Sequence, residues 1–213
     1  MSAKTPTPKV PRSPEYTRFV ESVKGVSPEW RESVDTGALL LLEKDERREA
    51  IDLLTEQLAL DDWRAPPALA AAEARGGVMP MKRRLPQASG RMKISIARAL
   101  VALGTIPRTD EITAEVLREG DPDSGLVALS EAEELRSVPV RDALAWSCLH
   151  HPSPEVRANA GAVLYYFAGL AEDPLAWDLR PIWIQLAEED PAVRKTAFEE
   201  ICQHIGMPPE IAG

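Results

Sequence analysis

One pattern occurs twice in the C-terminal part of the chain, and the two copies lie 37 residues apart. In each copy a capping residue and a proline precede Val-Arg, and a small residue, an aliphatic residue and a glycine follow at fixed offsets. A period between about 20 and 50 residues indicates supersecondary units that stack on one another. The first copy is Ser153, Pro154, Val156, Arg157, Ala160, Leu164 and Gly169, and the second is Asp190, Pro191, Val193, Arg194, Ala197, Ile201 and Gly206.

The residue types in each copy are those of a capped helix with one buried face. Ser153 and Asp190 are preferred N-cap residues, because their side-chain oxygens accept hydrogen bonds from unpaired N–H groups of the first turn. The proline that follows suits the first helical position, where no N–H partner exists. Gly169 and Gly206 suit the left-handed residue that closes a helix. The apolar face of the first copy consists of Val156, Ala160, Leu164 and Phe167.

The same spacing recurs less completely upstream. One partial copy can be capped by Asp45, and the other lacks the Asp-Pro start. The intervals between the four landmarks are 46, 64 and 37 residues, so an irregular array is expected. The upstream landmarks are Arg47, Ala50 and Leu54, and Lys93, Ile96 and Leu100.

Over residues 139–206 the chain resembles the HEAT-repeat family, whose second helix commonly begins Asp-Pro-x-Val-Arg and continues with Ala and Leu at these offsets. The resemblance implies an all-α fold, a right-handed α-solenoid of about four to five irregular HEAT-like helix pairs. In such arrays the arginine of the motif usually bonds a neighbouring repeat. Arg157 and Arg194 are therefore expected to be structural residues, and Asp190 a structural cap.

Composition supports a helical chain, because Ala, Leu, Glu and Arg are abundant and aromatic residues make up only 5%. The expected organisation is a Pro-rich disordered arm over residues 1–14, one HEAT-like domain over 15–206 and a C-terminal tail over 207–213. No apolar run has the length of a bilayer span. Only two cysteines are present, which favours a reducing, cytoplasmic compartment.

The pass along the chain predicts further helices. Those around 110–119 and 126–136 are expected to be separated by a break at 121–125, and Leu39–Leu42 is expected to be deeply buried on every side. A short helix and a loop are expected over 78–90. The other expected helices are 14–25, 28–37, 45–58, 66–77, 91–103, 139–150 and 174–188, the last bent at Pro181.

Charge is segregated along the chain. Residues 74–109 hold eight basic residues and no acidic one, whereas residues 110–213 hold seven basic and twenty acidic residues. The basic segment either pairs with its acidic flanks or forms a positive groove for an acidic partner. Under the second interpretation the binding residues are Lys82, Arg83, Arg84 and Arg91.

Two further features are candidate contacts for a partner. Glu188 and Glu189 belong to acidic clusters that recur on successive repeats and could attract a basic protein. Tyr165 lies opposite the apolar face by helical angle, so it is expected to be exposed and able to anchor a partner. The alternative interpretation of these residues is a solvated helix end and inter-helix packing, respectively.

The sequence does not indicate catalysis. His150 and His151 are adjacent and point about 100° apart on a helix, so no metal site is expected. No glycine-flanked serine, electropositive cysteine or phosphate-binding glycine loop occurs. We therefore expect neither a cofactor nor catalytic residues, and no membrane partner.

The leading functional hypothesis is a binding protein that uses a curved helical face. Residues 168–181 and the stretch to Gly206 resemble small bacterial HEAT-repeat immunity proteins that are encoded beside secreted toxins, which implies neutralisation of a toxin by covering its active site. Two alternatives remain: a scaffold or regulator of an endogenous protein, and a nucleic-acid-associated HEAT-like enzyme that uses segment 74–109. The acidic chain does not favour nucleic acid, because it repels phosphates.

Overall fold

The computed structural model of the chain describes residues 11–25, 27–174 and 179–213. Every regular element in these residues is a helix, so the prediction of an all-α fold is confirmed for them. Most of the predicted Pro-rich arm, residues 1–10, lies outside the described residues. None of the described helices combines the length and the apolar character that a bilayer span needs.

The chain divides into two compact units, residues 1–81 and 82–213, which we describe one by one. The prediction of a single domain over 15–206 stays a prediction. Helix α5 (Val78–Arg84) crosses the boundary. The elements of unit 1 are α1 (Pro14–Val23), η1 (Pro28–Trp30), α2 (Thr36–Leu41), α3 (Lys44–Ala59), α4 (Ala65–Ala71) and η2 (Arg75–Gly77).

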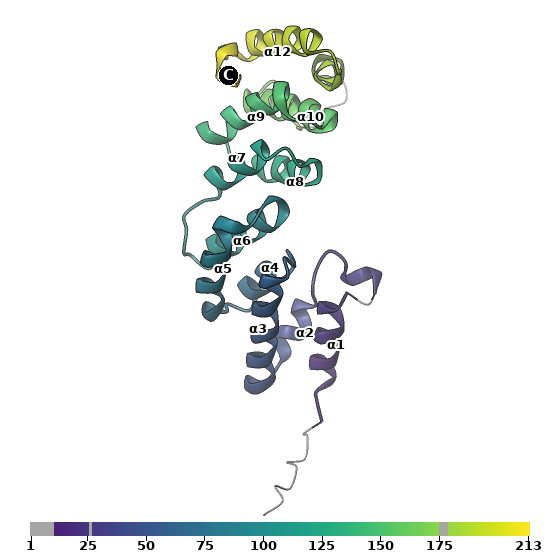
Figure 1. Cartoon of the computed structure of the whole chain (residues 1–213), viewed down its shortest axis with the longest axis vertical. Coiled ribbons are helices and arrows are strands. Elements are labelled where there is room, and N and C mark those ends of the chain that lie inside the picture. Colours follow the sequence, from purple (N-terminus) through teal and green to yellow (C-terminus); the bar gives the residue numbers. More distant parts are fainter. Residues whose placement is uncertain (1–10, 26, 175–178) are drawn as a thin grey trace, which may run out of the picture. The chain divides into compact units, whose positions relative to one another are not determined.

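Unit 1 is built around α3. Helix α1 packs on α2 and α3, and α4 packs on α3 (Figure 1). The centre of its core is formed by Phe19, Leu39, Leu54 and Leu69, all fully buried. The guanidinium of Arg64 donates to the carbonyls of Ser22 and Val23 at the C-terminal end of α1. Its Nη2 lies 2.6 Å from Asp62 Oδ2, which fixes the position of the guanidinium.

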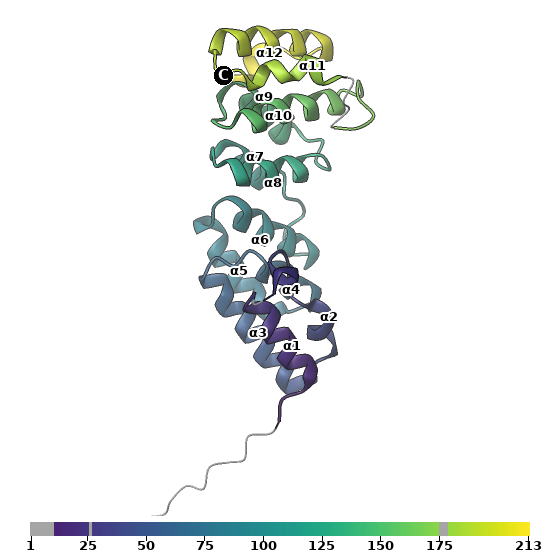
Figure 2. The ribbon, with the colours of Figure 1, turned by 90° about the vertical axis from the view of Figure 1, so that its right-hand side faces the viewer.

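Unit 2 consists of helices that follow one another in layers. Its elements are η3 (Leu85–Gln87), α6 (Gly90–Ala102), α7 (Asp110–Arg118), α8 (Pro122–Ala132), α9 (Val138–His150), α10 (Pro154–Phe167), α11 (Arg180–Trp183), η5 (Ile184–Ala187), α12 (Pro191–Ile205) and η6 (Pro209–Ala212). Helix α7 pairs with α8, α9 with α10, and the α11–η5 segment with α12 (Figure 2). Each pair packs on the next: α7 on α9, α8 on α10, and α10 on η5 and α12.

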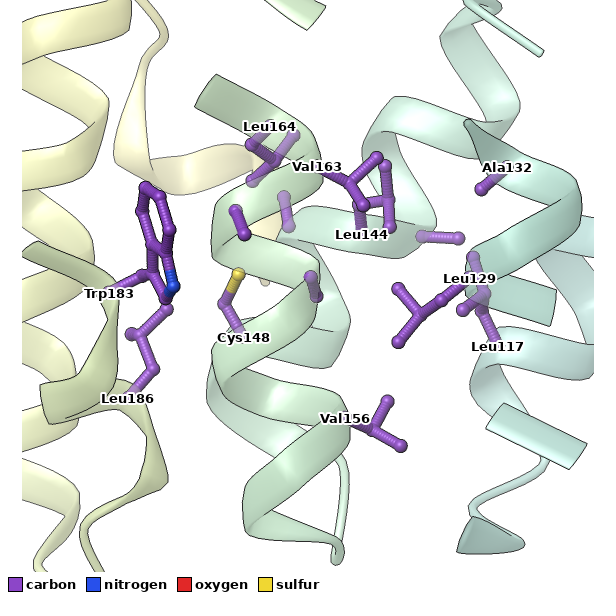
Figure 3. Close-up of a cluster of buried hydrophobic side chains, with 14 of the residues drawn as sticks. Leu117, Leu129, Ala132, Leu144, Cys148, Val156, Val163, Leu164, Trp183 and Leu186 are labelled. Carbon is purple, nitrogen blue, oxygen red and sulfur yellow. The ribbon is translucent and has the colours of Figure 1, made fainter. Parts of the chain in front are cut away.

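Small and branched apolar residues fill the space between these layers. Leu117, Leu129 and Leu144 meet on one side of α9 and α10, and Trp183 and Leu186 cover the other side (Figure 3). The residues predicted as a C-terminal tail, 207–213, include η6, which packs on α9. His150 Nε2 lies 3.0 Å from the Ala212 carbonyl oxygen and ties the two together.

One position recurs in several helices, four residues after the N-cap. In α3, α6, α10 and α12 this residue is a cation, and it reaches the end of a neighbouring helix or loop. Arg47 Nη2 donates to the carbonyl of Ala72, the C-cap of α4, at 3.0 Å. Lys93 Nζ lies 2.8 Å from the carboxylates of Glu115 and Glu119 at the end of α7. The N-caps are Glu43, Ser89, Ser153 and Asp190, and the cations are Arg47, Lys93, Arg157 and Arg194.

Arg157 shows the fullest form of this arrangement. Its side chain is 3% exposed, and Nε and Nη2 donate to the carbonyls of Leu186 and Ala187 at 2.8 Å. Nη1 donates to the carbonyls of His151 and Pro152, which precede its own helix. Arg157 thus joins α10 to the end of η5 in the next layer, because the carbonyls at a helix end have no partner within the helix.

Helix α8 departs from the pattern, since Gly125 occupies the position of the cation. A Cβ atom there would lie 3.0 Å from His151 Nε2 and 2.9 Å from Val156 Cγ2. His151, the C-cap of α9, fills the space with a ring that is 1% exposed. Its Nδ1 accepts from the Ser153 N–H at 3.1 Å, and its Nε2 has no hydrogen-bond partner among the described residues.

Several sequence-based boundaries were wrong for local reasons. The single helix expected over 28–37 is instead the 3-10 turn η1, followed by the start of α2 at Thr36, and Asp45 lies inside α3, whose N-cap is Glu43. Leu39 is buried, but Leu40 and Leu41 are 49% and 70% exposed, because six-residue α2 packs with one face only. The expected break at 121–125 is a helix start instead.

At that helix start, Asp121 caps α8 and accepts from the Ser124 N–H at 2.8 Å. Pro122 stands at the first helical position, so Asp121-Pro122 repeats the Asp190-Pro191 signature. The interval from Pro122 to Pro154 is 32 residues, and this copy divides the 64-residue interval that the sequence left unexplained.

The buried ring of His151 predicts a pH dependence of stability. Burial lowers the pKa of His151, so below about pH 6.5 the unfolded chain binds this proton more readily than the folded chain. The free energy of unfolding should therefore fall as the pH drops from about 6.5 towards the folded pKa and should be insensitive to His151 above that range. Urea unfolding at a series of pH values measures it. His151→Asn, which keeps an acceptor for Ser153 but cannot titrate, should show a shallower fall; an unchanged slope would contradict the assignment.

Candidate functional site

Unit 2 contains a groove of about 440 Å³ between the N-terminal half of α10 and the α11–η5 segment. We call it the α10–α11 groove. Its apolar side includes Ile184, which is 39% exposed, and Trp183, of which only 4% is exposed. Its polar side includes Glu155 and Asn159. The lining residues are Pro154, Glu155, Ala158, Asn159, Arg180, Trp183, Ile184 and Ala187.

Local sequence explains why a groove forms here. Pro181 lies in the first turn of α11, and the segment continues as the 3-10 helix η5 instead of a long α-helix. The segment approaches α10 at Gly161, where a Cβ atom would lie 2.5 Å from Leu186 Cδ1 and 3.1 Å from Trp183 Cβ. Gly161 therefore permits close packing deep in the layer, and the larger side chains at the rim leave the groove open.

The acidic residues predicted to contact a partner lie at one end of this groove. Glu188 and Glu189 directly follow the lining residue Ala187, and both are exposed. Their backbone is held in place, because Arg157 donates to the Glu188 carbonyl at 3.2 Å and Arg194 donates to both carbonyls at 3.0 and 2.8 Å. The groove therefore has an acidic rim on a fixed backbone.

Asp190 and Arg194 occupy the structural positions at the start of α12. Asp190 Oδ1 accepts from the Ala192 N–H at 2.8 Å. Arg194 bonds only the loop before its own helix, and its Nε is buried without a hydrogen-bond partner among the described residues. The equivalent atom of Arg157 donates to the next layer. Arg194 thus lacks the bonds by which Arg157 joins its helix to the next layer.

The expectation that Tyr165 is exposed was wrong. Tyr165 is 3% exposed, its ring packs 5.8 Å from that of Trp183, and its hydroxyl is hydrogen-bonded to His204 Nδ1. The face opposite Ala160 is covered because the α11–α12 layer packs on it, which the sequence of α10 alone does not reveal. Burial raises the pKa of the hydroxyl. Tyr165 is therefore a packing residue between α10 and α12.

The basic segment is partly neutralised by the acidic residues that follow it. Lys93 pairs with Glu115 and Glu119, Arg98 lies 3.4 Å from Glu131, and Arg108 lies 2.8 Å from Asp110. These three ion pairs agree with the interpretation in which the cations of segment 74–109 pair with acidic residues that neighbour the segment. The four basic residues that were predicted to bind a partner lie elsewhere on the segment: Lys82 and Arg83 are exposed on α5, and Arg84 and Arg91 are half-buried.

The structure does not bring the two predicted sets together. Arg91 lies on α6, which is at the other end of unit 2 from α12 and its acidic rim (Figures 1 and 2). The groove residues Ala158, Asn159 and Ile184 were not singled out by the sequence. The feature of the sequence that pointed to an irregular segment at this place was Pro181, which lies inside the expected helix 174–188.

The two cysteines of unit 2 are buried and are not reactive nucleophiles. Cys148 and Cys202 are free and at most 1% exposed. Burial raises the pKa of both thiols, that of Cys202 to about 11, so they stay protonated at neutral pH. Among the described residues no three His, Cys, Asp or Glu side chains are grouped as metal ligands would be. The chemistry that the groove offers is apolar contact with an acidic rim.

Comparison with protein-family models, with curated proteins and with solved structures found no match.

The close approach at Gly161 makes the groove sensitive to one methyl group. Gly161→Ala should lower the free energy of unfolding by about 1–2 kcal/mol, because overpacking by one carbon typically costs about 1–3 kcal/mol and the gain in helix propensity offsets at most about 1 kcal/mol. Denaturant unfolding measures the change. Gly76→Ala is the matched control, since a Cβ there meets nothing within 4 Å. A Gly161→Ala protein as stable as the control would show that the layer tolerates the methyl group.

Proposed function

We propose that this chain is a non-catalytic protein-binding module of the HEAT-like type, a right-handed α-solenoid, which neutralises a bacterial toxin domain by covering its active site. The observation that carries the proposal is the α10–α11 groove: Ile184 is exposed in a hollow whose end carries Glu188 and Glu189. An apolar contact surrounded by polar residues is the usual arrangement of a protein–protein hot spot.

The recurring bonds from a cation to the end of a later helix support the HEAT-like part of the proposal. Arg47, Lys93 and Arg157 stand at equivalent positions and bond the end of a later helix. A motif residue that joins one pair to the next is what the resemblance implies for its arginine. Stacked pairs of this kind leave elongated surfaces that can accommodate a folded partner.

Charge supports a basic partner. Residues 110–213 hold twenty acidic and seven basic residues, and the acidic rim of the groove belongs to this segment. A basic toxin domain would be steered towards it, which raises the association rate more than the final affinity. The same surface would repel a nucleic acid, in keeping with the pairing of Lys93, Arg98 and Arg108 to carboxylates.

Co-expression with the toxin encoded by the neighbouring gene tests the proposal. The chain should protect cells and co-purify with the toxin domain. Ile184→Asp should weaken the complex by at least about tenfold, because a charge replaces an apolar anchor at the centre of the contact. Val138→Asp is the matched control, since Val138 is 59% exposed and does not line the groove.

Continued killing with no complex formed would overturn the toxin part of the proposal. Recovery of a housekeeping protein through the same groove, lost in Ile184→Asp only, would instead identify a scaffold or regulator. Equal binding by Ile184→Asp and Val138→Asp would show that the groove is not the contact. Circular dichroism of each variant establishes that its fold is intact.

A further inference from the structure

Unit 1 contains a second hollow, of about 950 Å³, where the start of α1, the end of α2 and the first turns of α3 meet. We call it the α1–α3 hollow. It belongs entirely to unit 1 and shares no residue with the α10–α11 groove. Its lining residues are Pro11, Arg12, Ser13, Glu15, Leu41, Glu43, Lys44, Asp45, Glu46 and Glu49.

Part of the wall is fixed by hydrogen bonds between the chain before α1 and helix α3. The backbone N–H and the hydroxyl of Ser13 donate to the two carboxylate oxygens of Glu46, at 2.9 and 2.6 Å. Arg12 Nη2 lies 2.6 Å from Glu49 Oε2. The hydrogen bonds from Ser13 lower the pKa of Glu46, which keeps its carboxylate charged. The wall is therefore held in shape before anything binds.

The lining carries an excess of negative charge. It includes five carboxylates and only two cations, Arg12 and Lys44. Glu46 and Glu49 are bonded to Ser13 and Arg12 in the wall, and Asp45 Oδ1 lies 3.5 Å from Arg48 Nη2. Glu15 and Glu43 add further negative charge to the lining. The field in the hollow favours a lysine or arginine and disfavours phosphate groups.

An exposed leucine gives the same hollow an apolar surface. Leu41 is 70% exposed, and its neighbour Leu40 is 49% exposed, although α2 buries Leu39 completely. Burying a leucine that is left exposed is favourable by about 1.5–3 kcal/mol in general. An apolar side chain inside an acidic hollow suits an occupant that combines apolar and basic groups.

We infer that the α1–α3 hollow is a docking surface for a polypeptide segment of a partner protein in which apolar side chains alternate with lysine or arginine. Leu41 contacts the apolar side chain of the segment, and Glu15, Glu43 and Asp45 surround its cations. The inference does not depend on the α10–α11 groove, because the two sites involve different residues and different units.

The probe for this site is a fluorescein-labelled peptide of alternating lysine and leucine, titrated with the full chain by fluorescence anisotropy. Two matched peptides have serine in place of leucine or glutamate in place of lysine. The lysine–leucine peptide should bind best, and its affinity should fall with salt as surface electrostatics are screened. Leu41→Ser should weaken binding by about tenfold, which corresponds to about half of the burial of one leucine.

The chain is acidic overall, so the controls must separate the hollow from its net charge. Glu43→Gln with Asp45→Asn removes two charges from the hollow, and Glu199→Gln with Glu200→Gln removes two exposed charges from α12. Both double variants lower the net negative charge equally. Glu43→Gln with Asp45→Asn should weaken peptide binding several-fold more than Glu199→Gln with Glu200→Gln. Leu170→Ser is the control for Leu41→Ser, because Leu170 is 48% exposed and lies in unit 2.

Two results would overturn the inference. Equal losses in the hollow variants and the control variants would show that the peptide responds to net charge, and absence of binding at low salt would show that no site exists. Because Leu41, Glu43 and Asp45 are all exposed, these variants should remain folded at the temperature of the titration, which thermal unfolding of each variant measures. That measurement separates loss of a contact from loss of the fold.

Discussion

The arrangement of unit 2 depends on bonds from a buried cation, four residues after the N-cap of α6 and of α10, to the end of a later helix. Arg157 gives this contact its fullest form, since one guanidinium satisfies carbonyls of both its own loop and η5. Apolar packing between helices such as α9 and α10 stabilises the layers but is not directional. Directional bonds to particular carbonyls fix which turn of one layer faces which turn of the next.

The same contact shapes the candidate site. Arg157 holds the end of η5, Arg194 holds the two residues that follow it, and the acidic rim of the groove is thereby presented on a fixed backbone. Gly161 adds the second condition, because it lets Leu186 and Trp183 approach α10 while Ile184 stays at the surface. The groove thus results from how the α11–α12 layer is attached to α10. The rim residues Glu188 and Glu189 are positioned by the two arginines and not by a contact between their own side chains.

How much of this could be predicted depended on whether the cause is local. The caps at Ser153 and Asp190 and the helices they start were predicted, because capping and proline preferences act within one turn. Asp121-Pro122 has the same signature and was missed, since Ser124 and Gly125 follow it where Val-Arg stands in the other copies. The burial of Tyr165 and the exposure of Leu40 and Leu41 depend on which layer covers a face, and no spacing within one helix contains that information. The groove itself arises between two segments and could not be located from either.

The layers of unit 2 are not all fastened by the same chemistry. Between α6 and α7 the contact is an ion pair of the Lys93 ammonium with two carboxylates. Between α10 and η5 it is a set of hydrogen bonds from the Arg157 guanidinium to backbone carbonyls. Between α8 and the α9–α10 layer the contact is packing, because the imidazole of His151 fills the space that Gly125 leaves and its hydrogen bond goes to Ser153 beside it. Of these three contacts, only this one contains a group that mild acid charges, so a fall in pH weakens the packing between α8 and the α9–α10 layer.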